Sequence, residues 1–256
     1  MSKTKMSTQN LSKDIMSEAA TPAMPISNQV STTRIVGVVA LVLAASVIAQ
    51  NAMFDGGVAQ FLGIGNGTGA PTYGDPLGVV LAYHAANRGA VAVAAGLEAV
   101  NLPLLLLFVT ALHGLVQRRG GAGADWSRLV VAAGATLSAL SALTIATHIA
   151  VVLAADRLAE PTPTFEMIWQ LHAAVFALSL PALGATFIGA ALATHASGLT
   201  RPWQRLLGMA GGSLLILAGP GNLAIADGSP LVFVGVLGLA MWLAWLVVTG
   251  LRLIRG

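Results

Sequence analysis

The sequence predicts an all-α membrane protein, a polytopic bundle of six transmembrane helices with a short interfacial helix before the second span. Three observations indicate this fold. Hydrophobic residues make up 56% of the chain, charged residues only 9%, and the mean hydropathy is +0.80, a composition typical of membrane proteins. Six stretches are long enough to cross a hydrocarbon layer that requires roughly 20 residues per helix. The charged residues are sorted between the two ends of these stretches.

Two regions are expected. Residues 1–33 are rich in Ser, Thr, Lys and Met, lack a sustained apolar period and are predicted to form a disordered cytoplasmic tail. Residues 34–256 form the predicted transmembrane domain. Its six spans are predicted at residues 34–53, 89–115, 129–155, 166–194, 206–225 and 231–254, and the short interfacial helix at residues 77–87.

Several local signals refine these spans. Asp75 and Pro76 are typical of a helix start, with Asp as the N-cap and Pro at the first helical position. Pro181 predicts a kink in the fourth span, and the Gly-Pro-Gly-Asn sequence at 219–222 predicts a break in the fifth. The third span is rich in Ala, Gly, Ser and Thr, which allow close helix approach, so we expect it to be central in the bundle.

The Lys and Arg residues predict the orientation. Eleven of the 13 fall on one side of the membrane, and only Arg88 and Arg157 fall on the other. The eleven are Lys3, Lys5, Lys13, Arg34, Arg118, Arg119, Arg128, Arg201, Arg205, Arg252 and Arg255. Because basic residues are retained on the cytoplasmic side, both termini are predicted to be cytoplasmic.

Glu98 is the most informative residue of the spans, because it is a carboxylate within an apolar helix. An ionisable group at such a position costs at least about 2.5–3.5 kcal/mol unless it is neutralised or paired. Asn101 lies one turn later on the same face, and Pro103 removes the helical donor to the carbonyl of Ala99. This turn of the helix is therefore polar.

Polar residues from four predicted spans lie at similar depth, in the half of the membrane predicted to face outside. They are Glu98, Asn101, Thr144, Thr147, His148, His172 and Asn222. One interpretation is a single polar cavity that is open to the outside and serves as a ligand site or a proton relay. The other is a set of hydrogen bonds that only holds the helices together. The sequence leaves both interpretations open.

Glu98, His148 and His172 are also the candidate metal ligands. The pattern is weak, because each histidine stands alone on its helix and lacks the close spacing of zinc and copper sites. A b-type haem is the other conventional use of membrane histidines, with His148 and His172 near the outer side and His113 and His195 near the inner side. His172 and His195 are 23 residues apart, about 34 Å in a helix, which places both near the membrane surfaces. The identity of any cofactor is left undetermined.

Other protein classes are excluded or not expected. The chain has no cysteine, which excludes disulfides, thiolate metal sites and thiol catalysis. No lysine lies in a predicted span, which excludes a retinal Schiff base. Walker, dinucleotide-binding and G-x-S-x-G motifs are absent from the sequence. The pI near 9.8 reflects charges sorted by membrane side, so nucleic acid is not an expected partner.

Three stretches carry a resemblance to other proteins. They are LHAAVFALSLPALGATFIGAALATHASGLTRPWQRLLGMAGG at 171–212, AIADGSPLVFVGVLGLAMWLAWLVVTGLRLI at 224–254 and DPLGVVLAYHAANRGAV at 75–91. On these stretches the chain resembles, over about residues 33–255, a family of uncharacterised bacterial six-span integral membrane proteins. The resemblance implies the topology and no activity. The expected location is the bacterial cytoplasmic (inner) membrane.

These observations favour a non-catalytic subunit or a small binding or transport module, with an outward-facing polar cavity around Glu98. A b-type haem or metal-binding electron carrier and a membrane enzyme acting on a lipid-soluble substrate are the alternatives, so catalytic activity is left open. The lipid bilayer is the expected partner, and further membrane protein subunits or copies of this chain are additional candidates.

Overall fold

The fold is all α-helical over the part of the chain that is described. The structure is a computed structural model that describes residues 26–54 and 69–256. Within these ranges there is no strand, and six helices are long and apolar enough to cross a membrane. The predicted six-span helical fold is therefore confirmed, and the protein is a multi-pass integral membrane protein.

Each predicted span corresponds to one helix or to one interrupted helix. The spanning elements are α2 (Ile26–Phe54), α5 (Arg88–Arg119), α6 (Gly123–Ala155), α7 (Pro163–Ala196), α8 (Pro202–Ala218) with η1 (Gly219–Gly221) and α9 (Asn222–Ala226), and α10 (Val232–Arg255). The short helix α4 (Leu77–Ala86) precedes α5. Helix α2 begins inside the predicted tail, at Ile26. The prediction placed the start of the span where the apolar residues begin, but a helix can extend beyond them through polar residues. The rest of that tail, residues 1–25, lies outside the described residues.

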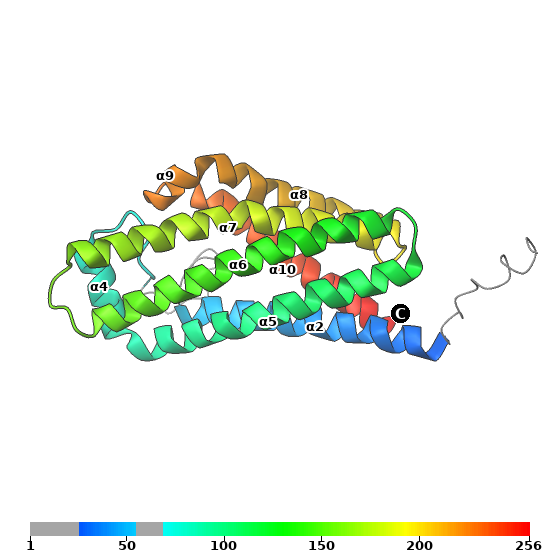
Figure 1. Ribbon diagram of the computed structural model, residues 1–256, viewed down its shortest axis with the longest axis horizontal. Coiled ribbons are helices and arrows are strands. Elements are labelled where there is room, and N and C mark those ends of the chain that lie inside the picture. Colours follow the sequence, from blue (N-terminus) through cyan, green and yellow to red (C-terminus); the bar gives the residue numbers. More distant parts are fainter. Residues whose placement is uncertain (1–25, 55–68) are drawn as a thin grey trace, which may run out of the picture.

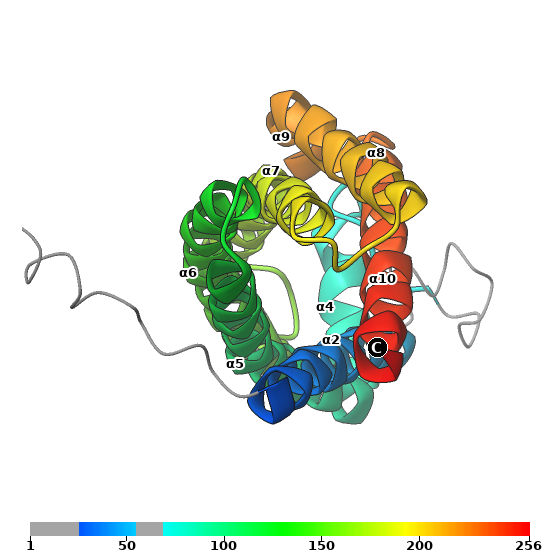
Figure 2. The same ribbon diagram turned by 90° about the vertical axis from the view of Figure 1, so that its right-hand side faces the viewer.

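The six spanning elements form a closed ring. Each packs on its neighbours in the chain, and α10 packs on α2 to complete the circle, as the view along the bundle shows (Figure 2). Helix α4 lies across one end of the ring, where it contacts α5 and α6 (Figure 1). We call this end the α4 end and the opposite one, where the chain finishes, the C-terminal end.

The most enclosed span is α7, and α6 lies at the periphery. In the most apolar window of α7, 56% of the residues are buried, compared with 22% in α6. The expectation that the third span is central is therefore wrong. Small residues permit close approach on one side of a helix, and they do not determine how many of its sides are covered. In α7, a Cβ added to Gly184 would lie 2.6 Å from the carbonyl oxygen of Gly212 in α8.

The local signals have mixed outcomes. The predicted break is confirmed, because α8 ends at Ala218 and the chain forms a 3-10 turn before α9. Pro181 lies inside α7, which continues through it. The predicted cap at Asp75 is wrong: Pro76 occupies the N-cap position of α4. The Asp75 carboxylate instead accepts hydrogen bonds from the backbone N–H and hydroxyl of Thr72, at 2.6 and 2.9 Å, and closes the turn before the helix.

Candidate functional site

A cavity lies inside the ring, between α2, α5, α6, α7 and α10. Its volume is about 240 Å³, slightly below the range of roughly 300–1,000 Å³ that is common for small-molecule sites. Its apolar wall is formed by Leu43, Val47, Leu102, Leu105, Leu137, Ile145, Phe176, Leu180, Leu183, Val236, Leu239 and Trp242. Its polar lining residues are Gln50, Asn51, Glu98, Asn101, Ser141, Thr144 and Ser179. The cavity is thus mostly apolar, and Glu98 is its one acidic lining residue among those described.

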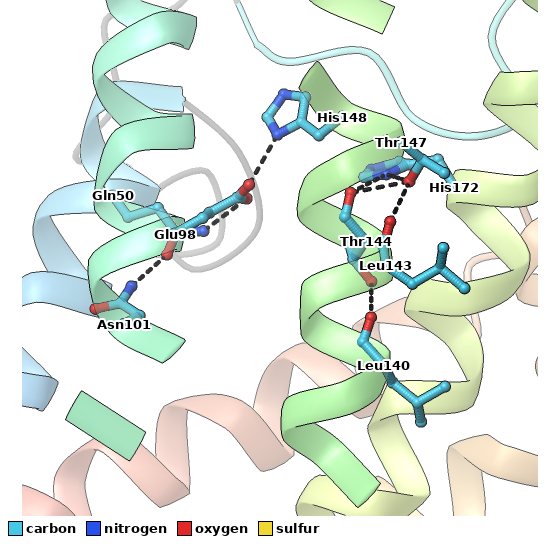
Figure 3. Close-up of polar contacts among 9 residues, drawn as sticks. All are labelled: Gln50, Glu98, Asn101, Leu140, Leu143, Thr144, Thr147, His148 and His172. Atoms are coloured by element: carbon cyan, nitrogen blue, oxygen red, sulfur yellow. Dashed lines mark hydrogen bonds and ion pairs between the residues drawn. The ribbon is translucent and has the colours of Figure 1, made fainter. Parts of the chain in front are cut away.

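A chain of hydrogen bonds connects three helices at this cavity (Figure 3). The Asn101 amide donates to the side-chain oxygen of Gln50 at 2.7 Å, and the Gln50 amide donates to Glu98 Oε1 at 3.0 Å. The other carboxylate oxygen of Glu98 is bonded to His148 Nδ1 at 2.9 Å. The network therefore joins α2, α5 and α6 and gives each Glu98 oxygen a partner.

Glu98 and His148 differ in their surroundings. The Glu98 side chain is 19% exposed and lines the cavity, whereas the His148 side chain is only 3% exposed. Their 2.9 Å hydrogen bond requires a proton between the carboxylate oxygen and the ring nitrogen. Removing either group leaves a largely buried polar atom of the other without this partner. Glu98 is therefore accessible to a ligand in the cavity, and it is bonded to His148, which is not accessible.

Two imidazole rings lie beside His148, and aromatic rings pack against one of them. The His148 ring centroid lies 6.0 Å from that of His84 in α4 and 5.4 Å from that of His172 in α7. The His172 ring stacks on Trp169 at 5.6 Å, and Tyr73, from the segment before α4, packs on Trp169 at 5.2 Å. Three histidines from three helices therefore meet at the α4 end.

The hydrogen bonds of His84 and His172 define where their protons lie. His84 Nδ1 is 2.7 Å from the Val80 carbonyl oxygen, and His172 Nδ1 is 3.2 Å from that of Thr144 and 3.0 Å from the Thr147 hydroxyl. A carbonyl oxygen only accepts, so Nδ1 carries a hydrogen in both rings. The Thr147 hydroxyl itself donates to backbone carbonyls of its own helix, at Leu143 and Thr144 (Figure 3).

Burial affects two groups of this cluster that lie outside the spanning helices. Burial lowers the pKa of His84, and nearby His148 lowers it further, against the opposing hydrogen bond to Val80. His84 is therefore neutral at pH 7. Burial also raises the pKa of the Tyr73 hydroxyl, and the charge of Glu98 adds to this increase. Tyr73 accordingly retains its proton.

The structure brings most of the predicted polar residues together. Glu98, Asn101 and His148 share one network, and Thr144, Thr147 and His172 form an adjacent one between α6 and α7. Asn222 lies in α9, which packs on α7, and it does not line the cavity. Of the residues predicted to form a polar cavity, Glu98, Asn101 and Thr144 line the cavity of the structure.

The metal and haem interpretations remain predictions. Among residues 26–54 and 69–256, no group of three or more His, Asp or Glu side chains is arranged to hold a metal ion. His148 and His172 lie 5.4 Å apart, within the range of directly packed rings, and Nδ1 of each is bonded to protein atoms. His113 Nδ1 is bonded to the Ser127 hydroxyl at 2.9 Å, between α5 and α6.

Four residues of the site do not follow from the sequence reasoning: Gln50, Tyr73, His84 and Trp169. Gln50 and Asn51 are adjacent polar residues in the last turns of the first span, and this pattern could have identified Gln50 from the sequence. His84 belongs to the predicted interfacial helix, but nothing in its spacing indicates that α4 turns this ring inward.

Comparisons with protein-family models, curated proteins and solved structures found no match to this chain.

Proposed function

We propose that the protein is a small binding or transport module of the membrane whose axial cavity binds a small lipophilic cation. One observation carries this proposal: Glu98 is a carboxylate in the wall of a cavity that is otherwise mostly apolar. Phe176 and Trp242 also line the cavity, and aromatic faces attract cations. The volume of about 240 Å³ suits a ligand of a single ring with a short charged group.

A cation bound in the cavity would lie beside the Glu98 carboxylate, whose two oxygens are hydrogen-bonded to Gln50 and His148. Among the described residues, no basic side chain lines the cavity to oppose a cation there. Tyr73 and His84, two titratable groups at the same end of the bundle, are both neutral at pH 7.

The proposed location is the bacterial cytoplasmic membrane, with both termini in the cytoplasm. The sorting of 11 of the 13 basic residues to one side supports this orientation. The α4 end, with the cavity network, then faces outside. On the described residues, no observation favours the haem, metal or enzyme alternatives over the binding module.

The test compares a permanent cation with a neutral molecule of the same shape. Benzyltrimethylammonium and neopentylbenzene differ in one atom, nitrogen against carbon, and the cation does not titrate. We expect the cation to raise the melting temperature of the purified protein and the neutral analogue to have a smaller effect.

Two variants make the test specific. Glu98→Gln should remove the preference for the cation, because it removes the charge and retains a similar size. Glu166→Gln is the matched control, since Glu166 is an exposed carboxylate at the same end that bonds to Gln170 and lies outside the cavity. Equal responses to the cation and the neutral analogue in the parent protein would refute the proposal.

A further inference from the structure

Arginines line two adjoining pockets at the C-terminal end of the bundle. The first pocket has a volume of about 250 Å³ and is lined by Arg34, Arg119, Arg252 and Arg255. The second has a volume of about 380 Å³ and is lined by Arg201, Arg252 and Arg255. Arg252 and Arg255 thus belong to both pockets, which lie at the opposite end of the molecule from the Glu98 network.

Close contact between α2 and α10 places these arginines together. A Cβ added to Gly37 would lie 2.7 Å from the carbonyl oxygen of Gly250, and one added to Gly250 would lie 2.9 Å from that of Gly37. Arg34 lies one turn before Gly37, and Arg252 lies two residues after Gly250. The crossing of the two helices therefore fixes basic residues of both at one pocket.

The loop between α7 and α8 holds two of the guanidinium groups. Arg252 Nε donates to the carbonyl oxygen of Leu199 at 2.8 Å, and a terminal nitrogen of Arg119 donates to that of Ser197 at 3.1 Å. A guanidinium has five N–H donors, so these bonds orient the groups and use only a minority of their donors. The remaining donors suit an anion with several oxygen atoms, such as a phosphate.

Apart from the backbone carboxylate of Gly256, which lines both pockets, the arginines have no acidic group nearby in the described part of the chain. Asp125 is the acidic residue of that part at this end, and it pairs with Arg128 at 3.3 Å. Among the described residues, no acidic side chain lines either pocket. Positive charges gathered in this way repel one another, and a bound anion offsets that repulsion.

We propose that the two pockets bind the phosphate group of an anionic phospholipid. The pockets lie at the ends of spanning helices, where lipid headgroups lie, and basic pockets between such helices are typical headgroup sites. Exposed apolar side chains continue from the pockets along the helices, including Ile35 and Val38 of α2 and Leu251 of α10. Trp203, which lines the second pocket, is an exposed aromatic residue at the same level, as is common at a membrane interface.

The test measures lipid binding to the purified full-length protein by native mass spectrometry. The parent is titrated with dioleoylphosphatidylglycerol, with dioleoylphosphatidylcholine and with inorganic phosphate. The variant is the double substitution R34Q/R255Q, which removes two exposed pocket arginines and leaves the Arg252 bond to Leu199 intact. The control is R118Q/R205Q, which removes the same charge at the same end from arginines that line neither pocket.

The proposal predicts tight binding of phosphatidylglycerol and weak binding of phosphatidylcholine by the parent. R34Q/R255Q should weaken phosphatidylglycerol binding by about tenfold or more, and R118Q/R205Q should change it little. Equal loss in both double variants would show general attraction to a basic surface and would overturn the proposal. So would displacement of the lipid by inorganic phosphate at the same concentration, which would identify the site as one for a soluble anion.

Discussion

Glu98 and His148 are hydrogen-bonded at 2.9 Å, yet Glu98 lines the cavity while His148 is enclosed by other rings. The two residues are 50 positions apart and come from α5 and α6. Their contact links the only acidic residue in the cavity lining, among the described residues, to the three histidines at the α4 end. Substitutions of either residue should therefore affect both the cavity and the packing of that end.

The first prediction concerns the structural part of this role. Glu98→Leu leaves the Gln50 amide and His148 Nδ1 without their acceptor, and it should lower the free energy of unfolding by about 1–2 kcal/mol. Glu98→Gln can still accept and donate, so it should cost less than Glu98→Leu. Unfolding of both variants and the parent in mixed micelles with increasing detergent denaturant measures the difference. If Leu is as stable as the parent, the network does not hold the helices together.

The sequence predicts the fold well because the membrane imposes a strong pattern. Spans must be about 20 apolar residues long, and their basic flanks are sorted, so the number and order of the helices follow from composition. The pairing of helices is not encoded in that pattern. Glu98 and Asn101 are recognisable on their own, but their partner Gln50 depends on α2 lying beside α5.

The same limit explains the two failed expectations. The small residues of the third span predict close contact, which occurs with α7, but the ring leaves the other side of α6 uncovered. Asp75 has the sequence context of a helix cap, and its carboxylate instead closes a turn with Thr72. The position of α6 and the role of Asp75 both depend on the tertiary arrangement, which cannot be predicted from hydropathy or from capping preferences.

The second prediction is a pH dependence at the α4 end. Burial lowers the pKa of His84 in the folded protein, so the unfolded chain binds a proton more readily as the pH falls through the usual histidine range near 6.5. The stability associated with neutral His84 is therefore fully present above that range and is lost below it. His84→Gln stays neutral at all pH values and should flatten this part of the profile.

Melting temperatures of the parent and H84Q between pH 5 and 7.5 check the second prediction. The difference between the two proteins isolates His84, because the carboxylates and the other histidines titrate in both. His195→Gln, a half-buried position at the C-terminal end, is the control and should retain the parent's slope. A slope in H84Q identical to that of the parent would contradict the prediction.

The third prediction concerns the orientation. Reporter fusions after residues 122, 200 and 256 should report the cytoplasm, and a fusion at residue 160, between α6 and α7, should report the outside. The reason is the excess of arginine at the C-terminal end of the bundle. A periplasmic signal at residue 122 would overturn the proposed orientation, and with it the assignment of the Glu98 cavity to the outer half of the membrane.

The last prediction tests closure of the ring between its first and last helices. Gly37→Ala places a methyl group within contact of the Gly250 carbonyl oxygen and of the Ile254 side chain, at 2.7 and 2.9 Å. Because one of these atoms is backbone, α2 and α10 must separate, and overpacking of this kind costs about 1–3 kcal/mol.

Gly96→Ala in α5 is the matched control, since a Cβ there meets no atom within 4 Å and alanine favours the helix by about 0.5–1 kcal/mol. Unfolding measurements should therefore show a loss of stability for Gly37→Ala and none for Gly96→Ala. Since the same contact sets the spacing of Arg34 and Arg252, Gly37→Ala should also weaken binding of phosphatidylglycerol, and an unchanged stability would show that α2 and α10 do not pack at these glycines.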